Sequence, residues 1–285
     1  MLRGMSLISP ESLAERLDDP RLRLLDVRWW LTDLPRGHRD YLAGHLPDAV
    51  WVDLDRDLAA PTGPGRHPLP DPAVFAARMA ELGVADDADV VVYDDNGGMI
   101  AARVWWMLED LGHRSVRVLD GGFVAWADAG LPVTTEIPTP TPGRLTLADH
   151  WTRIIAREGL LARLGSVGLI DARAPERYRG ETEPVDAYPG HIPTAVNRPL
   201  GGNLGPDGRF LAPDALRARF TGLGEPVVTA CGSGINACHN ALAMRVAGLP
   251  DPILYEGSYS DWSRAGMPVA TGDEPGSMPP QRTTR

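Results

Sequence analysis

Short apolar runs alternate with stretches of helical spacing along most of the chain. Residues 89–93 (DVVVY) in the first half and 226–229 (PVVT) in the second are each followed by a glycine-rich turn. After the second turn, small and apolar side chains recur every three or four positions from Ala237 to Ala247. Short apolar runs between turn residues are typical of buried strands, and this spacing indicates a helix. The alternation predicts an α/β protein with mainly parallel sheets flanked by helices.

The same pattern occurs twice, at a separation close to half the chain. Residues 24–28 (LLDVR) correspond to 169–173 (LIDAR), and the tetrapeptide around His45 (GHLP) corresponds to that around His191 (GHIP). Such self-similarity predicts a tandem duplication, with two domains of one fold. We expect Arg173 to pair with a carboxylate, and the two histidines to hold turns rather than to catalyse.

Changes in composition divide the chain into four parts. We expect a first domain at 5–132, a connector rich in Thr and Pro at 133–146, and a second domain at 147–271. Alternating prolines favour an extended, semi-rigid connector. The Gly- and Pro-containing stretch 272–285 is expected to be a flexible tail. A long loop at 55–72, with several Gly and Pro, is expected to be functional because such loops in compact domains often are.

Composition excludes several classes of function. The chain has 285 residues, 43% hydrophobic and 23% charged, which is ordinary for a globular protein. Its net charge of -10, without a basic block, argues against nucleic acid as a partner. No long apolar run suggests a membrane span or an export signal, and two cysteines do not form a secreted disulfide framework, so we expect a reducing, cytoplasmic setting. The sequence has no metal-ligand spacing and no nucleotide-binding glycine motif, so we expect no cofactor.

Cys231 is the candidate nucleophile, because it lies between a predicted strand and a predicted helix. The glycines at 232 and 234 let the backbone curl, so that N–H groups and the positive end of the helix face the sulfur. Such a loop favours a thiolate, and would also hold a persulfide or another anion. The alternative is a buried cysteine before an ordinary turn. Aligning the two halves on their glycines places Asp95 opposite Cys231, so only the second half carries the thiol.

Together these residues resemble the two-domain rhodaneses, a family of sulfurtransferases with an inactive first domain and a catalytic second one. The resemblance covers nearly the whole chain. The sequence Cys-Gly-Ser-Gly that starts at Cys231 is similar to the loop of 3-mercaptopyruvate-type members, whereas thiosulfate-preferring members usually carry Arg and Lys after the cysteine. The resemblance implies that Cys231 takes sulfur from 3-mercaptopyruvate or thiosulfate and becomes a persulfide. It then passes the sulfur to cyanide or a thiol, such as a thioredoxin-like protein or a small thiol.

The resemblance also implies roles for individual residues. Ser233, His67 and Asp55 match a proton relay, in which the serine acts as a general acid and base. Arg177 matches the arginine that binds the substrate carboxylate, a task that suits the forked guanidinium. The other residues expected to contact substrate are Gly232, Gly234, Ile235, Asn236 and Ala237. The alternative is that His67 and Asp55 are ordinary loop residues and that Arg177 is a surface arginine.

Two departures from the family pattern leave other readings open. Residues 181–186 lack the second arginine that 3-mercaptopyruvate-type members usually carry, and Asn236 stands where threonine is common. A thiosulfate-preferring enzyme and a persulfide carrier without turnover are therefore alternatives. A phosphatase of the same fold would need an arginine six residues after Cys231, where the chain has Ala237.

Cys238 is expected to pack in the core.

Overall fold

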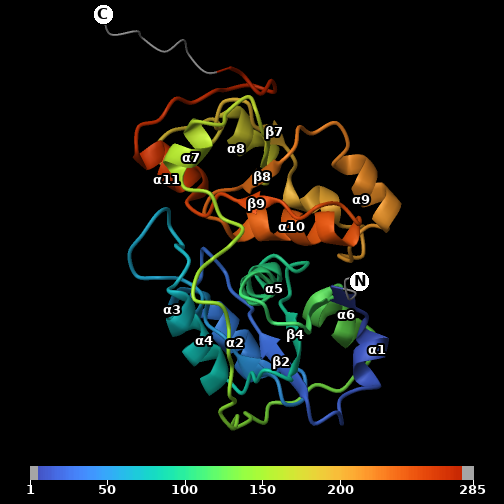
Figure 1. The fold of residues 1–285 in the computed structure, drawn as a ribbon. Helices are drawn as coiled ribbons and strands as arrows, with labels where there is room; N and C mark the ends of the chain where they lie inside the picture. The colour runs from blue at the N-terminus through green and yellow to red at the C-terminus, as the bar shows by residue number, and fades with distance from the viewer. Residues whose placement is uncertain (1–5, 278–285) are drawn as a thin grey trace, which may run out of the picture.

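The computed structural model describes residues 6–277, which form two α/β domains arranged one above the other (Figure 1). Within this range every strand pairs with its neighbours in parallel. The first sheet has the order β1-β5-β4-β2-β3 and the second the order β7-β6-β8-β9. The strands are β1 (Leu7–Ile8), β2 (Leu22–Asp26), β3 (Val50–Trp51), β4 (Asp89–Tyr93), β5 (Val116–Leu119), β6 (Gly168–Asp171), β7 (Val196–Asn197), β8 (Val227–Ala230) and β9 (Ile253–Leu254). The predicted fold class is confirmed.

Helices flank both sheets, as the alternation of patterns predicts. The first domain contains α1 (Pro10–Ala14), α2 (Arg36–Ala43), α3 (Leu54–Asp57), α4 (Pro72–Glu81), α5 (Ala101–Asp110) and α6 (Gly122–Asp128). The second contains α7 (Arg157–Leu161), α8 (Pro175–Arg179), the 3₁₀ helix η1 (Leu200–Asn203), α9 (Pro213–Arg219), α10 (Ile235–Val246) and α11 (Ser258–Arg264). Within residues 6–277, none of these helices is long and apolar enough to cross a bilayer.

The middle of strand β4 is apolar, as expected for a central strand whose two faces are covered by helices. Val90, Val91 and Val92 of β4 are fully buried, which is typical of a parallel strand inside an α/β domain. The two domains meet where α5 packs against α10, and the core residues Trp105 and Leu242 lie in this shared apolar cluster. The interface is thus part of the hydrophobic core, which fixes the loops on either side of it.

The histidines of the two repeated tetrapeptides hold turns, as predicted. His45 Nδ1 lies 2.8 Å from the carbonyl oxygen of Tyr41, and His191 Nδ1 lies 2.8 Å from that of Tyr178. Each ring also stacks on the tyrosine, with centroids 4.1 Å and 3.7 Å apart. Both side chains are fully buried, so neither is available to a substrate.

Strand register corrects the alignment of the two halves at the site. β4 ends at Tyr93 and β8 at Ala230, and each of these residues pairs with the aspartate that ends the neighbouring strand. The residues that follow, Asp94 and Cys231, therefore occupy equivalent positions. The prediction that Asp95 lies opposite the cysteine was wrong, because the first-domain loop, 94–100, is longer than 231–234 and alignment on glycines shifts it.

The connector runs extended along the first domain before it reaches the second (Figure 1). Thr134 forms an antiparallel bridge with His45, and the N–H of Gly143 donates to the carbonyl oxygen of Ala80 at 2.8 Å. These contacts tie the connector to the surface of the first domain.

The beginning of the C-terminal stretch is bound to the second domain. The N–H of Gly272 donates to the carbonyl oxygen of Arg179 at 2.9 Å, and that of Thr194 donates to the carbonyl oxygen of Pro275 at 2.6 Å. Residues 272–277 therefore differ from the expected flexible tail. The remainder of that tail, 278–285, lies outside the described residues.

Candidate functional site

The loop after β8 surrounds the sulfur of Cys231 with backbone donors. The N–H groups of Ser233 and Gly234 are directed at Cys231 Sγ, at 3.4 and 3.1 Å. Gly234 has a positive φ of 84° and precedes α10, and a Cβ there would lie 2.7 Å from the carbonyl oxygen of Glu256. Only glycine suits this position. The two donors and the N-terminus of α10 favour negative charge on the sulfur.

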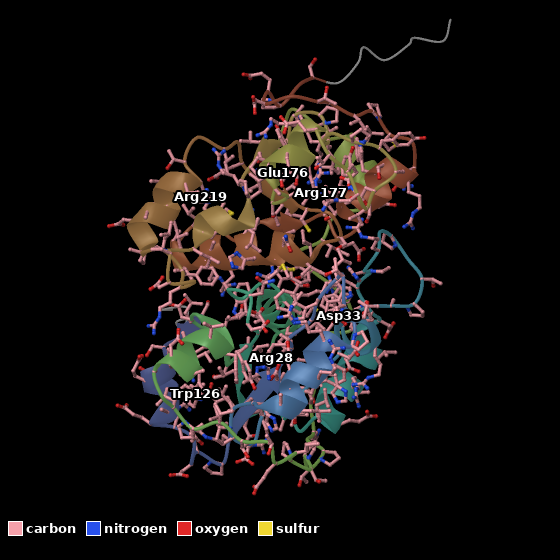
Figure 2. All side chains as sticks on the ribbon, turned by 180° about the vertical axis from the view of Figure 1, so that it is seen from behind. Arg28, Asp33, Trp126, Glu176, Arg177 and Arg219 are labelled. Atoms are coloured by element: carbon pink, nitrogen blue, oxygen red, sulfur yellow. The ribbon has the colours of Figure 1, made fainter. Side chains whose placement is uncertain are left out.

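Cys231 borders a cavity of about 330 Å³ between the domains. The first domain contributes a group of lining residues that includes Trp29, Trp30, Arg66 and His67, and the second contributes Arg177, Ser233 and the cysteine. Side chains from both domains meet across this interface, and Figure 2 labels Arg177 on the second domain. The site therefore exists only where the two domains are joined.

His67 contacts Ser233 across the interface, as the resemblance implied. Its Nδ1 lies 2.9 Å from Ser233 Oγ. Burial, together with the positive charges of Arg103 and Arg66, lowers the pKa of His67 to about 4. The imidazole is therefore neutral near pH 7 and can accept a proton from the serine hydroxyl.

Arg103 of α5 positions the loop that carries His67. Its side chain is fully buried, and Nη2 donates to the carbonyl oxygens of Leu58, His67 and Pro68 at 3.0, 2.8 and 3.3 Å. The same loop is fixed from the second domain, where Ser260 Oγ accepts from the N–H of Arg66 at 3.1 Å. These bonds explain why a long loop holds a catalytic candidate at a defined place.

Asp55 of α3 lies beside His67 without a direct hydrogen bond to it. Asp55 Oδ1 is 3.6 Å from His67 Nε2, which exceeds a hydrogen-bond distance, while Oδ2 accepts from Trp29 Nε1 at 3.0 Å. The carboxylate side chain is 48% exposed. Asp55 can orient the imidazole through charge, but it is held less firmly than the pair between His67 and Ser233.

Arg177 of α8 reaches the cavity while paired with two carboxylates. Its Nη2 donates to Glu183 Oε1 at 2.7 Å and to Asp186 Oδ2 at 2.9 Å. Arg173, which also borders the cavity, is taken up by Asp171 as predicted, with Nη2 to Oδ2 at 2.7 Å. Of these two arginines, Arg177 is the one placed to meet a substrate anion.

The other predicted contact residues divide into three groups. Gly232, Ile235 and Asn236 line the cavity, whereas Gly234 donates its N–H to the sulfur. Ala237 is fully buried in the core and does not line the cavity, so its assignment to substrate binding is corrected. The reason is the helical turn, which directs the side chain at 237 inward.

Cys238 packs in the core, as predicted. It is fully buried, and its Sγ donates to the carbonyl oxygen of Gly234 at 3.2 Å. Burial raises the pKa of this thiol to about 12, so it stays protonated.

Among the described residues, no group of three or more His, Cys, Asp or Glu side chains could hold a metal ion.

Sequence reasoning missed Arg66, whose guanidinium lies beside Gly232 in the loop that carries Cys231. Arg66 Nη1 donates to Asp186 Oδ1, so it shares this carboxylate with Arg177. The available signal was its position directly before His67, since a loop that places one residue in the site also brings its neighbour near.

Comparison with known proteins agrees with this geometry. Residues 9–129 and 157–265 match the family described as Rhodanese-like domain. A protein of Pseudomonas aeruginosa named "Probable 3-mercaptopyruvate sulfurtransferase" is 47% identical over 284 residues, covering 95% of this chain and 100% of that protein. The thiosulfate sulfurtransferase of Rattus norvegicus is 37% identical over 278 residues, covering 92% and 93%.

A solved structure extends the likeness to three dimensions. The structure of an Escherichia coli protein, described as a 3-mercaptopyruvate sulfotransferase, matches with a TM-score of 0.80 at 32% identity. The match covers 90% of this chain and 99% of that one. The chain therefore belongs to the rhodanese family and is a two-domain sulfurtransferase.

Proposed function

We propose that this sulfurtransferase takes sulfur from 3-mercaptopyruvate and passes it through a persulfide on Cys231 to a thiol. The observation that carries the proposal is the 2.9 Å contact between His67 Nδ1 and Ser233 Oγ beside the cysteine loop. A sulfur donor whose cleavage requires a proton to be transferred can use this serine–histidine pair. The names of the similar proteins from Pseudomonas aeruginosa and Escherichia coli support the same donor.

The first half-reaction forms an S–S bond and breaks a C–S bond. The Cys231 thiolate attacks the sulfur of the donor, and the electron pair of the C–S bond leaves with the carbon as the enolate of pyruvate. The products are the Cys231 persulfide anion and, after protonation at carbon, pyruvate. In the net step, one proton moves from the sulfur of the donor to its carbon.

Ser233 and His67 are the groups placed to carry that proton. The Asp55 carboxylate lies on the Nε2 side of His67, which favours the tautomer with hydrogen on Nε2 and leaves Nδ1 to accept from Ser233. The serine oxygen can then accept the thiol proton while its own hydrogen moves to His67 Nδ1. The serine next donates a proton to the enolate carbon and takes one back from His67, so both residues end as they began. Thiosulfate needs no such transfer, because cleavage of its S–S bond releases sulfite directly.

Arg177 binds the carboxylate of the donor in this proposal. Its guanidinium borders the cavity beside Cys231, and Nη1, which has no hydrogen bond to another described residue, can donate a charge-assisted hydrogen bond to a carboxylate. Glu183 and Asp186 hold its other donors and fix its direction. Orientation of the donor sulfur toward the thiolate follows from this anchor.

In the second half-reaction, an acceptor thiolate attacks the outer sulfur of the persulfide and releases the Cys231 thiolate. A thioredoxin-like protein or a small thiol is the expected acceptor, and cyanide can replace it in an assay. A reducing cytoplasmic setting, expected from the cysteine content, would keep both cysteines as thiols and remains a prediction.

The test compares two donors on one enzyme preparation. Steady-state kcat/KM is measured for 3-mercaptopyruvate and for thiosulfate, with a small thiol and then with cyanide as acceptor. The proposal expects 3-mercaptopyruvate to give the higher value by at least about tenfold, because only this donor uses the proton path. A higher value for thiosulfate overturns the choice of donor, and a single turnover with either donor identifies a carrier instead.

A further inference from the structure

Two arginines from different domains converge beside the residue that follows the nucleophile. A Cβ at Gly232 would lie 2.7 Å from Arg66 Nη2 and 3.6 Å from Arg177 Nη1. Arg66 comes from the first-domain loop, and Arg177 from α8 of the second domain. Because Gly232 has no side chain, both guanidinium groups can lie against the backbone of the cysteine loop.

Asp186 shows how a carboxylate joins this pair. It accepts from Arg66 Nη1 with one oxygen and from Arg177 Nη2 with the other, at 2.9 Å for the second contact. The Asp186 side chain is only 2% exposed, so it belongs to the wall of the site rather than to solvent. It therefore holds the two cations together without filling the cavity in front of them.

Arg66 has donors to spare. Its Nε is buried without a hydrogen-bond partner, and among the contacts of residues 6–277 its side chain uses only Nη1. By contrast, Arg173 is occupied by Asp171, Glu183 and the carbonyl oxygen of Gly190. A donor without a partner is costly when buried, and Nη2, the Arg66 nitrogen nearest Gly232, is the donor that an anion in the cavity can reach.

We infer that Arg66 is a second anion-binding residue of the donor site, supplied by the first domain. It forms with Arg177 a two-cation seat next to Cys231, and the donor carboxylate occupies this seat. The identity of that anion rests on the proposed function, whereas the existence of the seat rests on the geometry alone. Residues 181–186 carry no arginine, and Asp186 of that segment instead binds Arg66.

Alkylation of Cys231 by an anionic and by a neutral reagent tests this inference without sulfur transfer. The rates with iodoacetate and iodoacetamide are measured by peptide mass mapping, and their ratio reports attraction of an anion to the site. Arg66→Gln is expected to lower the ratio about tenfold, because a charge-assisted hydrogen bond is lost. Arg21→Gln, which removes an exposed arginine with the same charge change, is the control and should leave the ratio unchanged.

Gly232→Ala displaces Arg66 without altering charge. Its Cβ would overlap the flexible end of that side chain, and Gly232 does not have a positive φ, so the backbone accepts alanine. This variant is also expected to lower the ratio. In turnover, Arg66→Gln should raise KM for 3-mercaptopyruvate about tenfold with little change in kcat, which a merely structural role would not produce.

The outcomes separate the two proposals. An unchanged ratio in Arg66→Gln, measured beside a lowered ratio in Arg177→Gln, overturns the role of Arg66 even if 3-mercaptopyruvate is the donor. A lowered ratio in an enzyme that fails to use 3-mercaptopyruvate keeps the two-cation seat and removes only the assigned donor.

Discussion

The two loops that follow β4 and β8 occupy equivalent positions but hold different groups. In the first domain, Asp94 accepts hydrogen bonds from backbone N–H groups of its loop and of the first turn of α5, at 2.8 to 3.0 Å. In the second, Cys231 Sγ accepts from two such groups at 3.1 and 3.4 Å. The fold thus forms a loop of inward-directed backbone N–H groups twice. In the first domain the Asp94 carboxylate occupies this loop permanently, whereas in the second the loop holds a sulfur that can react.

The first domain nevertheless contributes half of the site. His67 and Arg66 come from its long loop, and Asp55 comes from α3. The domain without a thiol thus lines the cavity beside the thiol of the other domain. The comparison teaches that the site is built by the pair of domains rather than by the domain with the cysteine alone.

Replacing the reactive atom should have the largest effect. Cys231→Ser is expected to lower sulfur transfer by at least about 1000-fold, because a hydroxyl is a far weaker nucleophile than a thiolate at neutral pH. Steady-state turnover with both donors and cyanide-trappable persulfide are the measurements. Cys238→Ala is the matched control and should retain transfer. If Cys231→Ser turned over as fast as the unmodified protein, Cys231 would not be the nucleophile.

Removing the hydroxyl of Ser233 should slow turnover of 3-mercaptopyruvate much more than turnover of thiosulfate. Ser233→Ala is expected to lower kcat for 3-mercaptopyruvate about 100-fold, the usual size of a lost acid–base contribution, and to change thiosulfate turnover by less than about threefold. Only the first donor requires a proton to move from sulfur to carbon. Equal losses with both donors would assign Ser233 to the shape of the loop instead.

Removing the Asp94 carboxylate should reduce the stability of the fold rather than alter sulfur transfer. Asp94→Ala leaves buried backbone N–H groups without acceptors, so the free energy of unfolding is expected to fall by at least about 2 kcal/mol. Urea unfolding measures this change. Asp87→Ala, at an exposed aspartate before β4, should stay within about 0.5 kcal/mol. Wild-type stability in Asp94→Ala would show that its hydrogen bonds are replaceable.

The buried imidazole of His67 should make stability depend on pH. Its pKa is about 4 in the folded protein and about 6.5 when unfolded, so between these values the unfolded chain binds more protons. Stability is therefore full above pH 6.5 and falls as the pH is lowered toward 4. His239, whose pKa is also lowered to about 4, acts in the same window.

Urea unfolding at pH 7 and at pH 5 measures this dependence. The loss of unfolding free energy on going to pH 5 is expected to be about 1–2 kcal/mol smaller in His67→Gln than in the unmodified protein. The same loss in both proteins would mean that His67 titrates normally in the fold.

Local pattern predicted the fold well, because strand and helix follow from residues near one another in sequence. The apolar run at 89–93 became β4, and the glycine-flanked cysteine came to lie at the end of β8 as expected. The glycine alignment failed at Asp95, because strand register rather than glycine spacing fixes which residues are equivalent.

The composition of the cavity was harder to predict from the sequence. His67 and Ser233 are 166 positions apart and meet because α5 packs against α10 and Arg103 holds the long loop. Such contacts depend on tertiary packing, which no local pattern encodes. The resemblance to a family supplied His67, but a residue outside the family pattern, Arg66, became visible only in three dimensions.

A double-mutant cycle on Ser233 and His67 tests most directly the claim that the two domains form one proton path. The values of kcat/KM for 3-mercaptopyruvate are measured in Ser233→Ala, in His67→Gln and in the variant with both changes. Residues that act as one unit are strongly non-additive, so the double variant is expected to be no more than about threefold worse than Ser233→Ala alone. Losses that multiply in the double variant would contradict the account, because the serine and the histidine would then act independently.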